Sequence, residues 1–324
     1  MRRLPIFTFL FLSFVWISSS WATYSIVARD METGEMGVAV QSHWFSVGSV
    51  VPWAQAGVGA VATQSLVDPS YGSKGISLMS GGASPVLALE QLLLADEHPE
   101  IRQVAMVNAH GEVAAHTGAK CIDYASHIVG NGYSVQANLM KNSTVPQAMA
   151  KAFENAKGPL AERLLAALAA AQAEGGDIRG QQSAAILVVS AKATGEKWVD
   201  VLVDLRVEDH AAPVEELSRL LEIHRGYALM NDGDLAVENG DLKGADYFYG
   251  EAQRILKDNL EAEYWHAVAL VNAGNLDSSL PLFGKIFYAD ENWRRLIPRL
   301  VKAELLLADA ESVARIMTVI PAQK

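Results

Sequence analysis

The chain changes character at Pro213, and this change limits the folds that are open to it. Before Pro213, runs rich in Val and Ile alternate with runs rich in Ala and Leu, whereas the remainder is helical in composition. Strand patterns occupy residues 24–29, 37–41, 57–63, 103–108, 111–117, 183–189 and 198–207. The order of strands, helix, strands, helices and strands predicts a layered α+β domain, followed by a small all-α domain. The pattern does not decide between one sheet and two.

The helices of the first part are marked by their starting residues. Ser84 and Pro85 provide an N-cap and a first-turn proline for a helix over residues 86–94, and Pro146 and Pro159 begin two more. Residues 66–74 contain Asp68, Pro69 and Gly72, which predict a loop over a sheet edge. Residues 130–137, which contain Gly130 and Gly132, are expected to form a further strand of the sheet.

The helical tail contains an internal repeat. The segments Asn239-Gly240-Asp241-Leu242 and Ala273-Gly274-Asn275-Leu276 begin at positions 239 and 273, a spacing of 34 residues that is the tetratricopeptide period. Two units are fewer than an independent solenoid needs. We therefore expect the tail to pack against the first domain or to be capped by residues 213–230 and 298–319.

Charge and cysteine content exclude several classes of protein. The net charge of −11 argues against nucleic-acid binding, which requires clustered Lys and Arg to neutralise phosphates. The one cysteine, Cys121, cannot form an intramolecular disulfide, so the core must stabilise the fold without covalent cross-links.

The first 22 residues have the layout of a secretory signal. Arg2 and Arg3 precede an apolar run over residues 4–17, and small residues occupy most of 18–22. The run is shorter than the roughly 20 residues of a membrane-spanning helix, so we expect no stable membrane anchor after processing. Cleavage after Ala22 would make Thr23 the first residue of a periplasmic or secreted protein.

An N-terminal threonine has a chemistry that an internal one lacks. Its free α-amine has a pKa of about 7.7–8.0 and can accept the proton of its own hydroxyl, directly or through water. Thr23 would then supply both nucleophile and base. The alternative is that Thr23 is a β-favouring residue that follows a cleavage site.

Several segments resemble one bacterial family. They are Thr23-Tyr-Ser-Ile-Val-Ala-Arg-Asp30, Gly37-Val-Ala-Val-Gln-Ser42, Gly57-Val-Gly-Ala-Val-Ala-Thr-Gln64, His116-Thr-Gly118 and Val203-Asp-Leu-Arg206. They resemble the family described as domain of unknown function 1028, and the resemblance runs through His210. It implies an N-terminal-nucleophile hydrolase-like fold, a four-layer αββα sandwich with the first mature residue at the end of a sheet. We therefore expect a signal peptide over 1–22, this sandwich over 23–212 and a tetratricopeptide-like domain over 213–324.

An acyl-transfer site also needs donors for a developing oxyanion. Asn138 and Gln41, near strand ends in family-like segments, are the candidates, although either amide could instead satisfy buried backbone groups. Four charged residues could form pairs at the mouth of a cleft or ordinary ion pairs at strand ends: Arg29, Asp30, Asp204 and Arg206. Ser42 and His43 lie just beyond the second strand and are further candidates for lining the site.

A second chemistry is conceivable at His116, Cys121 and His127. Cysteine and histidine can form a nucleophile and base pair, and the two histidines with Asp123 could bind a metal. The spacings match no strong metal motif, and a lone cysteine is more often a small buried residue. We expect neither a metal nor a cofactor.

The leading hypothesis is an exported hydrolase of an amide or peptide-like bond, with Thr23 as nucleophile and a small-molecule or peptide-like substrate. The alternative is a non-catalytic envelope binding or scaffold protein, in which the sandwich and the helical tail capture a ligand or a protein partner.

Overall fold

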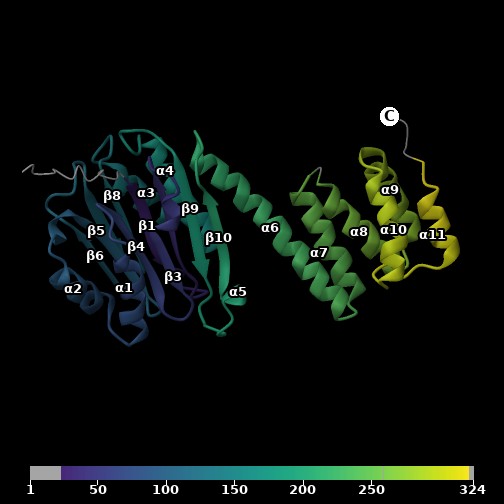
Figure 1. Ribbon diagram of the computed structural model, residues 1–324, viewed down its shortest axis with the longest axis horizontal. Helices are drawn as coiled ribbons and strands as arrows, with labels where there is room; N and C mark the ends of the chain where they lie inside the picture. Colours follow the sequence, from purple (N-terminus) through teal and green to yellow (C-terminus); the bar gives the residue numbers. More distant parts are fainter. Residues whose placement is uncertain (1–22, 258, 321–324) are drawn as a thin grey trace, which may run out of the picture. The chain divides into compact units, whose positions relative to one another are not determined.

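The computed structural model describes residues 23–257 and 259–320 (Figure 1). The predicted signal segment, residues 1–22, lies outside the described residues. The chain divides into two compact units, the first ending at Leu217 and the second beginning at Ser218. This division falls inside the long helix α6, Pro213–Glu238, whose first residue is the point where the composition changes.

The first unit contains two antiparallel sheets, so the predicted α+β class is confirmed. Strand order is β10-β9-β2-β1-β8-β7 in one sheet and β3-β4-β5-β6 in the other. The strands of the first sheet are β1 Thr23–Arg29, β2 Met36–Ser42, β7 Ser126–Gly130, β8 Tyr133–Asn138, β9 Ser183–Val189 and β10 Val201–Val207. Those of the second are β3 Pro52–Gln55, β4 Gly59–Ser65, β5 Arg102–Asn108 and β6 Val113–Thr117.

Helices cover the outer faces of the two sheets, which pack face to face (Figure 1). Helices α1 (Ser70–Ser80) and α2 (Pro85–Ala95) pack against the four-stranded sheet. Helices α3 (Val145–Asn155) and α4 (Leu160–Ala173) pack against the six-stranded sheet. Three short helical segments complete the unit: η1 Val47–Ser49, η2 Pro99–Ile101 and α5 Lys197–Asp200. The choice between one sheet and two, left open by the sequence, is thus settled as two.

Part of the layer between the sheets is an apolar core. Strands of both sheets place Val and Ala there because alternate residues of a strand point to the same face. Its buried members are Val27, Met36, Val38, Val40, Val47, Val51, Ala56, Ala60, Ala62, Ala105, Val107, Ala185 and Val189. The rest of this layer is polar, as described below.

Helix α1 differs from the sequence expectation. Residues 66–74 were expected to form a loop, but α1 begins at Ser70, whose N–H donates to the Asp68 carboxylate over 2.9 Å. The helical Gly72 is required because a Cβ there would come within 2.1 Å of the Trp53 ring. This glycine permits close packing of the helix on the sheet, whereas the sequence analysis interpreted it as a turn residue.

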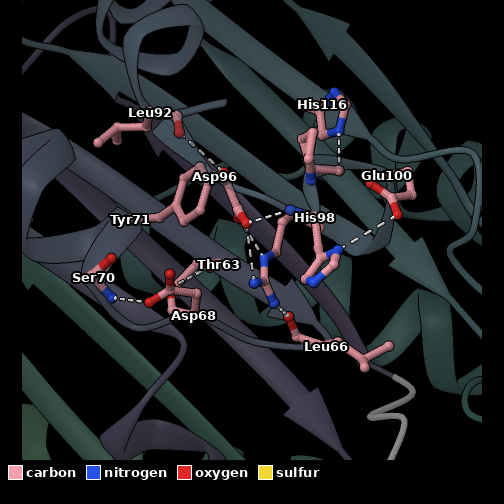
Figure 2. A network of polar contacts seen from close by, with 12 residues as sticks. Thr63, Leu66, Asp68, Ser70, Tyr71, Leu92, Asp96, His98, Glu100 and His116 are labelled. Atoms are coloured by element: carbon pink, nitrogen blue, oxygen red, sulfur yellow. Dashed lines mark hydrogen bonds and ion pairs between the residues drawn. The ribbon is translucent and has the colours of Figure 1, made fainter. Parts of the chain in front are cut away.

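A charged cluster ties α1 and α2 to the start of β5 (Figure 2). The Arg102 guanidinium bonds both carboxylate oxygens of Asp96, over 2.7 and 3.3 Å, and donates to the Leu66 carbonyl over 2.5 Å. The Tyr71 hydroxyl donates to Asp96 over 2.9 Å. Hydrogen bonds from Arg102, with those from the His98 N–H and Tyr71, hold the pKa of the Asp96 carboxyl at about 2.

The second unit consists of helices that pack in sequence order. They are α7 Leu242–Ile255, α8 Leu260–Asn272, α9 Leu276–Ala289, α10 Asn292–Lys302 and α11 Ala310–Met317, together with most of α6. The helical C-terminal region is therefore confirmed. Gly240 and Gly274, from the two repeated segments, adopt φ of 73° and 82° in the turns before α7 and α9. Among the helices that the structure describes, none combines the length and apolar character needed to cross a membrane.

We predict that Asp96→Asn lowers the free energy of unfolding by about 2 kcal/mol at pH 7, since each pKa unit corresponds to about 1.4 kcal/mol. Because the folded-state pKa is lowered, this stabilisation is present above the unfolded-state pKa of about 3.9 and disappears as pH falls towards 2. Urea denaturation of both proteins at pH 7 and pH 3 would show the difference shrinking. Glu100→Gln is the control, because the Glu100 pair with Lys120 lies at the surface and should change stability little.

Candidate functional site

Thr23 lies at one end of a central strand of the six-stranded sheet. It is the first residue of β1, and the register places it opposite Ser42 of β2 and Asn138 of β8. Its hydroxyl donates to the Ser42 Oγ over 3.0 Å, and all three residues are fully buried. The structure therefore brings together three residues that sequence analysis named as site candidates.

Amide side chains fix the main chain of Thr23. Gln64 Nε2, from β4 of the opposite sheet, donates to the Thr23 carbonyl over 3.2 Å, and Asn138 Nδ2 approaches the same oxygen at 3.4 Å. Ser25, two residues along β1, donates to Gln64 Oε1 over 2.6 Å. Contacts from both sheets thus determine the position of Thr23.

Gln103 of β5 is the centre of this network. Its Oε1 accepts hydrogen bonds from Gln64 and Asn138 over 2.7 and 3.0 Å. Its Nε2 donates to the Thr117 hydroxyl over 2.9 Å and to the carbonyls of Ser126 and Ala137 over 3.2 and 2.9 Å. One fully buried amide therefore joins strands of both sheets.

The network continues to two further groups. The Thr117 hydroxyl lies 2.8 Å from His127 Nδ1, and burial, with the neighbouring His116, lowers the pKa of His127. On the other side, Gln136 Nε2 donates to the Ser25 hydroxyl over 2.6 Å. Sequence analysis missed Gln64, Gln103 and Gln136, because an isolated polar residue in a strand pattern does not reveal its partners. Their only signal is a glutamine inside a strand pattern that also contains Val and Ala.

Two residues beside the network adopt the left-handed backbone region, which non-glycine residues seldom occupy. Ser65 has φ of 72° and directly follows Gln64, and Leu139 has φ of 57° and directly follows Asn138. Such conformations persist where the surroundings over-determine the backbone, and they concentrate at functional sites. Both flank the amides that contact Thr23.

Gln41 lies in β2 next to Ser42, but register places it on the opposite face of the sheet. It pairs with Tyr24, whose hydroxyl donates to Gln172 of α4 over 2.9 Å, so this face is turned towards the helices. Gln41 is fully buried, and both polar atoms of its amide lack a hydrogen-bond partner among the described residues. The structure therefore does not bring Gln41 to the Thr23 hydroxyl.

His43 is held near the helical face. Its main-chain N–H donates to the Asp177 carboxylate over 2.9 Å, and its ring Nδ1 lies 3.3 Å from the Gln181 carbonyl. Arg179 pairs with the same carboxylate over 3.0 Å. Asp177 is a buried charge that sequence analysis missed, and it anchors the chain that follows β2.

The four charged candidates lie away from Thr23. Arg29 and Asp30 are at the far end of β1, where Arg29 donates to the Ala109 carbonyl over 2.8 Å and Asp30 pairs with Arg163 over 2.9 Å. Asp204 and Arg206 pair with each other over 3.0 Å on β10, which β9 and β2 separate from β1. Asp30 thus takes part in an ion pair at a strand end, whereas Arg29 bonds a carbonyl and the Asp204 and Arg206 pair lies within a strand.

Among the residues that the structure describes, no histidine forms a hydrogen bond with Cys121. Its thiol donates to the Arg102 carbonyl over 3.3 Å, and burial raises its pKa. His116 instead contacts the Pro99 carbonyl through Nε2 at 2.9 Å. Across the part of the chain that the structure describes, no group of three or more His, Cys, Asp or Glu side chains is arranged to hold a metal ion.

Comparisons with known proteins fall on this unit. Residues 23–217 match the Family of unknown function (DUF1028), beginning at Thr23 and ending at the last residue of the first unit. The chain is also similar to the crystal structure of protein SPO2555 from Silicibacter pomeroyi, described with the same family, at 28% sequence identity and a TM-score of 0.56. That similarity covers 62% of this chain and 85% of the other. A search of curated proteins found no match.

Two of the buried glutamines, Gln103 and Gln41, offer a matched test of the network. We predict that Gln103→Leu lowers the free energy of unfolding by about 2–4 kcal/mol, because the buried partners of Gln103 lose the hydrogen bonds that its amide makes to them. Gln41→Leu removes no hydrogen bond to a described residue and should be near neutral or stabilising. Urea denaturation of both variants measures this. Equal losses would contradict the central role of Gln103.

Proposed function

The chain belongs to the Family of unknown function (DUF1028), and from this membership and the position of Thr23 we propose that it is an exported hydrolase of the N-terminal-nucleophile type. The proposed substrate is a small molecule or peptide with an amide or peptide-like bond. The observation that carries the proposal is the placement of Thr23 at the start of a central strand, held by contacts from both sheets.

The proposed fold is the four-layer αββα sandwich of the N-terminal-nucleophile hydrolases. The packing of α1 and α2 on one sheet and of α3 and α4 on the other supports this assignment. The proposed route to activity is export followed by cleavage after Ala22, which would free the Thr23 amine. The charged start, apolar run and small residues of positions 1–22 support that step.

The proposed reaction uses the two functional groups of Thr23. The α-amine accepts the hydroxyl proton as the hydroxyl oxygen attacks the carbonyl carbon of the amide. The proton then passes to the nitrogen of the leaving amine. The C–N bond breaks, the amine leaves, and the acyl group remains on Thr23 as an ester. Water hydrolyses the ester and restores the hydroxyl. Metals and cofactors take no part in this scheme.

The surrounding residues receive positioning roles in this proposal. Ser42 accepts the Thr23 hydroxyl hydrogen bond and so fixes the direction of the nucleophile, while Gln64 and Asn138 hold the Thr23 carbonyl. Holding a nucleophile in one orientation lowers the entropic part of the barrier. Asn138 Nδ2 already bonds Gln103 and contacts Thr23, so we assign Asn138 to holding the strand rather than to the oxyanion.

We predict that the protein purified from its native envelope begins at Thr23, as intact mass and terminal sequencing would show. This form should hydrolyse members of an amide library. It should also form a covalent adduct with a peptidyl epoxyketone, because the hydroxyl and the amine of one terminal threonine can bond its ketone carbon and its epoxide carbon. Loss of a general base typically lowers a rate by about 10²–10⁴-fold, so a chain with Ala22 retained should lose activity to this degree.

Variants at Thr23 separate chemistry from folding. Thr23→Ala should abolish hydrolysis and adduct formation, whereas Thr23→Ser keeps a hydroxyl beside the amine and should retain both. Circular dichroism would show whether each variant is folded. A native terminus other than Thr23, or full activity in Thr23→Ala, would refute the proposal.

A groove in the second unit supports a second proposed function, the capture of a basic peptide by a tetratricopeptide-like tail. The cavity, of about 480 Å³, lies between α6, α7 and α8. Its described lining residues include three carboxylates and no Lys or Arg; the carboxylates are Asp234, Glu238 and Glu261. Tyr227, Tyr249 and Trp265 add aromatic surface, which attracts cations as well as apolar groups.

We predict that a fluorescent peptide containing Arg and Leu binds this groove and that binding weakens as ionic strength rises. Reversing two lining charges in Glu238→Lys/Glu261→Lys should reduce affinity about tenfold or more, as fluorescence anisotropy would measure. Glu311→Lys, in α11 outside the groove, is the control. Equal binding by all three proteins would exclude the groove as the site.

A further inference from the structure

The side-chain oxygen of Asn138 is a buried acceptor without a donor. Asn138 is fully buried, and its Oδ1 has no hydrogen-bond partner among the residues that the structure describes. The orientation of the amide is fixed by its other end, because Nδ2 lies 3.0 Å from Gln103 Oε1 and 3.4 Å from the Thr23 carbonyl, and both of these oxygens are acceptors. An acceptor that is buried and unpaired carries a desolvation cost, so a native structure seldom keeps one without a role.

The main-chain nitrogen of Thr23 is directed towards the same residue. The Arg29 N–H donates to the Gly132 carbonyl over 2.8 Å, and from there the register between β1 and β8 runs without interruption to Thr23 opposite Asn138. In an antiparallel pair, alternate residues direct their main-chain groups to the same neighbouring strand. Thr23 lies an even number of residues from Arg29, so its nitrogen also points to β8. It therefore faces Asn138 rather than Ser42 of β2.

The other acceptors around Thr23 are already in use. The Ser42 hydroxyl accepts from the Thr23 hydroxyl. Every other side-chain amide oxygen of the network accepts at least one hydrogen bond: Gln64 Oε1 from Ser25, Gln103 Oε1 from Gln64 and Asn138, and Gln136 Oε1 from Ser134. Within the described network, Asn138 Oδ1 is therefore the amide oxygen that can still receive a donor.

We propose that Asn138 Oδ1 accepts a hydrogen bond from the α-amine of Thr23 in the chain that begins at this residue. A peptide nitrogen carries one N–H, whereas a neutral terminal amine carries two and a lone pair. One N–H keeps the direction of the strand pairing, and the second, which cleavage after Ala22 creates, meets Oδ1. The lone pair is then left for the proton of the Thr23 hydroxyl. This inference rests on the proposed function and makes Asn138 a positioning residue for the base.

The hydrogen bond holds the base in one orientation. A terminal amine can rotate about its N–Cα bond, and it accepts the hydroxyl proton only when its lone pair faces that hydroxyl. The hydroxyl is itself held by Ser42, so fixing the amine brings both groups of Thr23 into register and lowers the entropic part of the barrier. After proton transfer the amine is an ammonium, whose hydrogen bond to the Asn138 oxygen is charge-assisted.

Few charges surround the amine. Among the described residues, the side chains that bond Thr23 are uncharged: Ser42, Gln64 and Asn138. His127 joins the network through Thr117, and its lowered pKa favours the neutral ring. Asp177 pairs with Arg179 near Tyr24, on the helix-facing side of the sheet. A carboxylate placed at position 138 should therefore be the charge that acts most strongly on the amine.

Variants of the chain that begins at Thr23, released from a cleavable fusion, test this bond. Nuclear magnetic resonance with isotope-labelled threonine would follow the pKa of the terminal amine. Asn138→Asp keeps an acceptor and adds a negative charge, so it should raise this pKa by about one unit or more. Asn138→Leu removes the acceptor of the charged form and should lower the pKa by about one unit. Asn155→Asp makes the same charge change at the last residue of α3 and should leave the pKa unaltered.

A crystal structure of the same chain measures the contact without a variant, and it should place Asn138 Oδ1 within about 3.2 Å of the Thr23 nitrogen. Above the amine pKa, Asn138→Asp should hydrolyse amides faster than Asn138→Leu, with the acid limb of kcat/KM shifted to higher pH. Hydrolysis without this contact, or an amine pKa that is insensitive to position 138, would overturn the inference and leave the hydrolase proposal standing. The contact and the pKa shifts in a protein that cleaves no amide would support the bond and count against the hydrolase instead.

Discussion

The hydrogen bonds of Gln103 fix the arrangement of the two sheets at the end where Thr23 begins β1. The two sheets meet through apolar packing in one region and through this amide network in the other. Apolar contacts tolerate small shifts, but a buried amide is stable only when its donors and acceptors meet their partners. The network therefore fixes how the sheets are placed relative to each other at the end where β1 begins. Next to Gln103 in β5, Arg102 is held by its ion pair with Asp96.

The strands and most helices of the first unit follow from local patterns. Val and Ile runs identified most strands, and the Ser84 hydroxyl caps α2 as predicted, accepting from the Leu87 N–H over 3.3 Å. Helix α1 was missed because its glycines serve packing. Gly75, like Gly72, lies against the neighbouring sheet, with a Cβ position 2.9 Å from the Met106 side chain. Sequence alone cannot distinguish a glycine needed for a turn from one needed for close contact.

The site was predictable only in part, because its members come from both sheets. Thr23, Ser42 and Asn138 occupy adjacent strands and were identified by sequence pattern and by resemblance. Gln64 and Gln103 reach Thr23 only when the second sheet packs on the first, which no local pattern encodes. Gln41 shows the opposite case. It neighbours Ser42 in sequence, but the two-residue period of a strand turns consecutive side chains to opposite faces.

The strained residues beside the network are consistent with this account of its rigidity. A left-handed backbone at Ser65 or Leu139 is unfavourable for a residue with a side chain, by about 1–3 kcal/mol, so neighbouring interactions must offset the cost. Gln64 and Asn138, which immediately precede these residues, each bond Gln103, and a chain held at that point has little freedom to relax. The same bonds that hold Thr23 therefore maintain the strain at both strand ends. Because the strained residues lie where β4 and β8 end, the two strands turn away from the sheets immediately beyond Thr23.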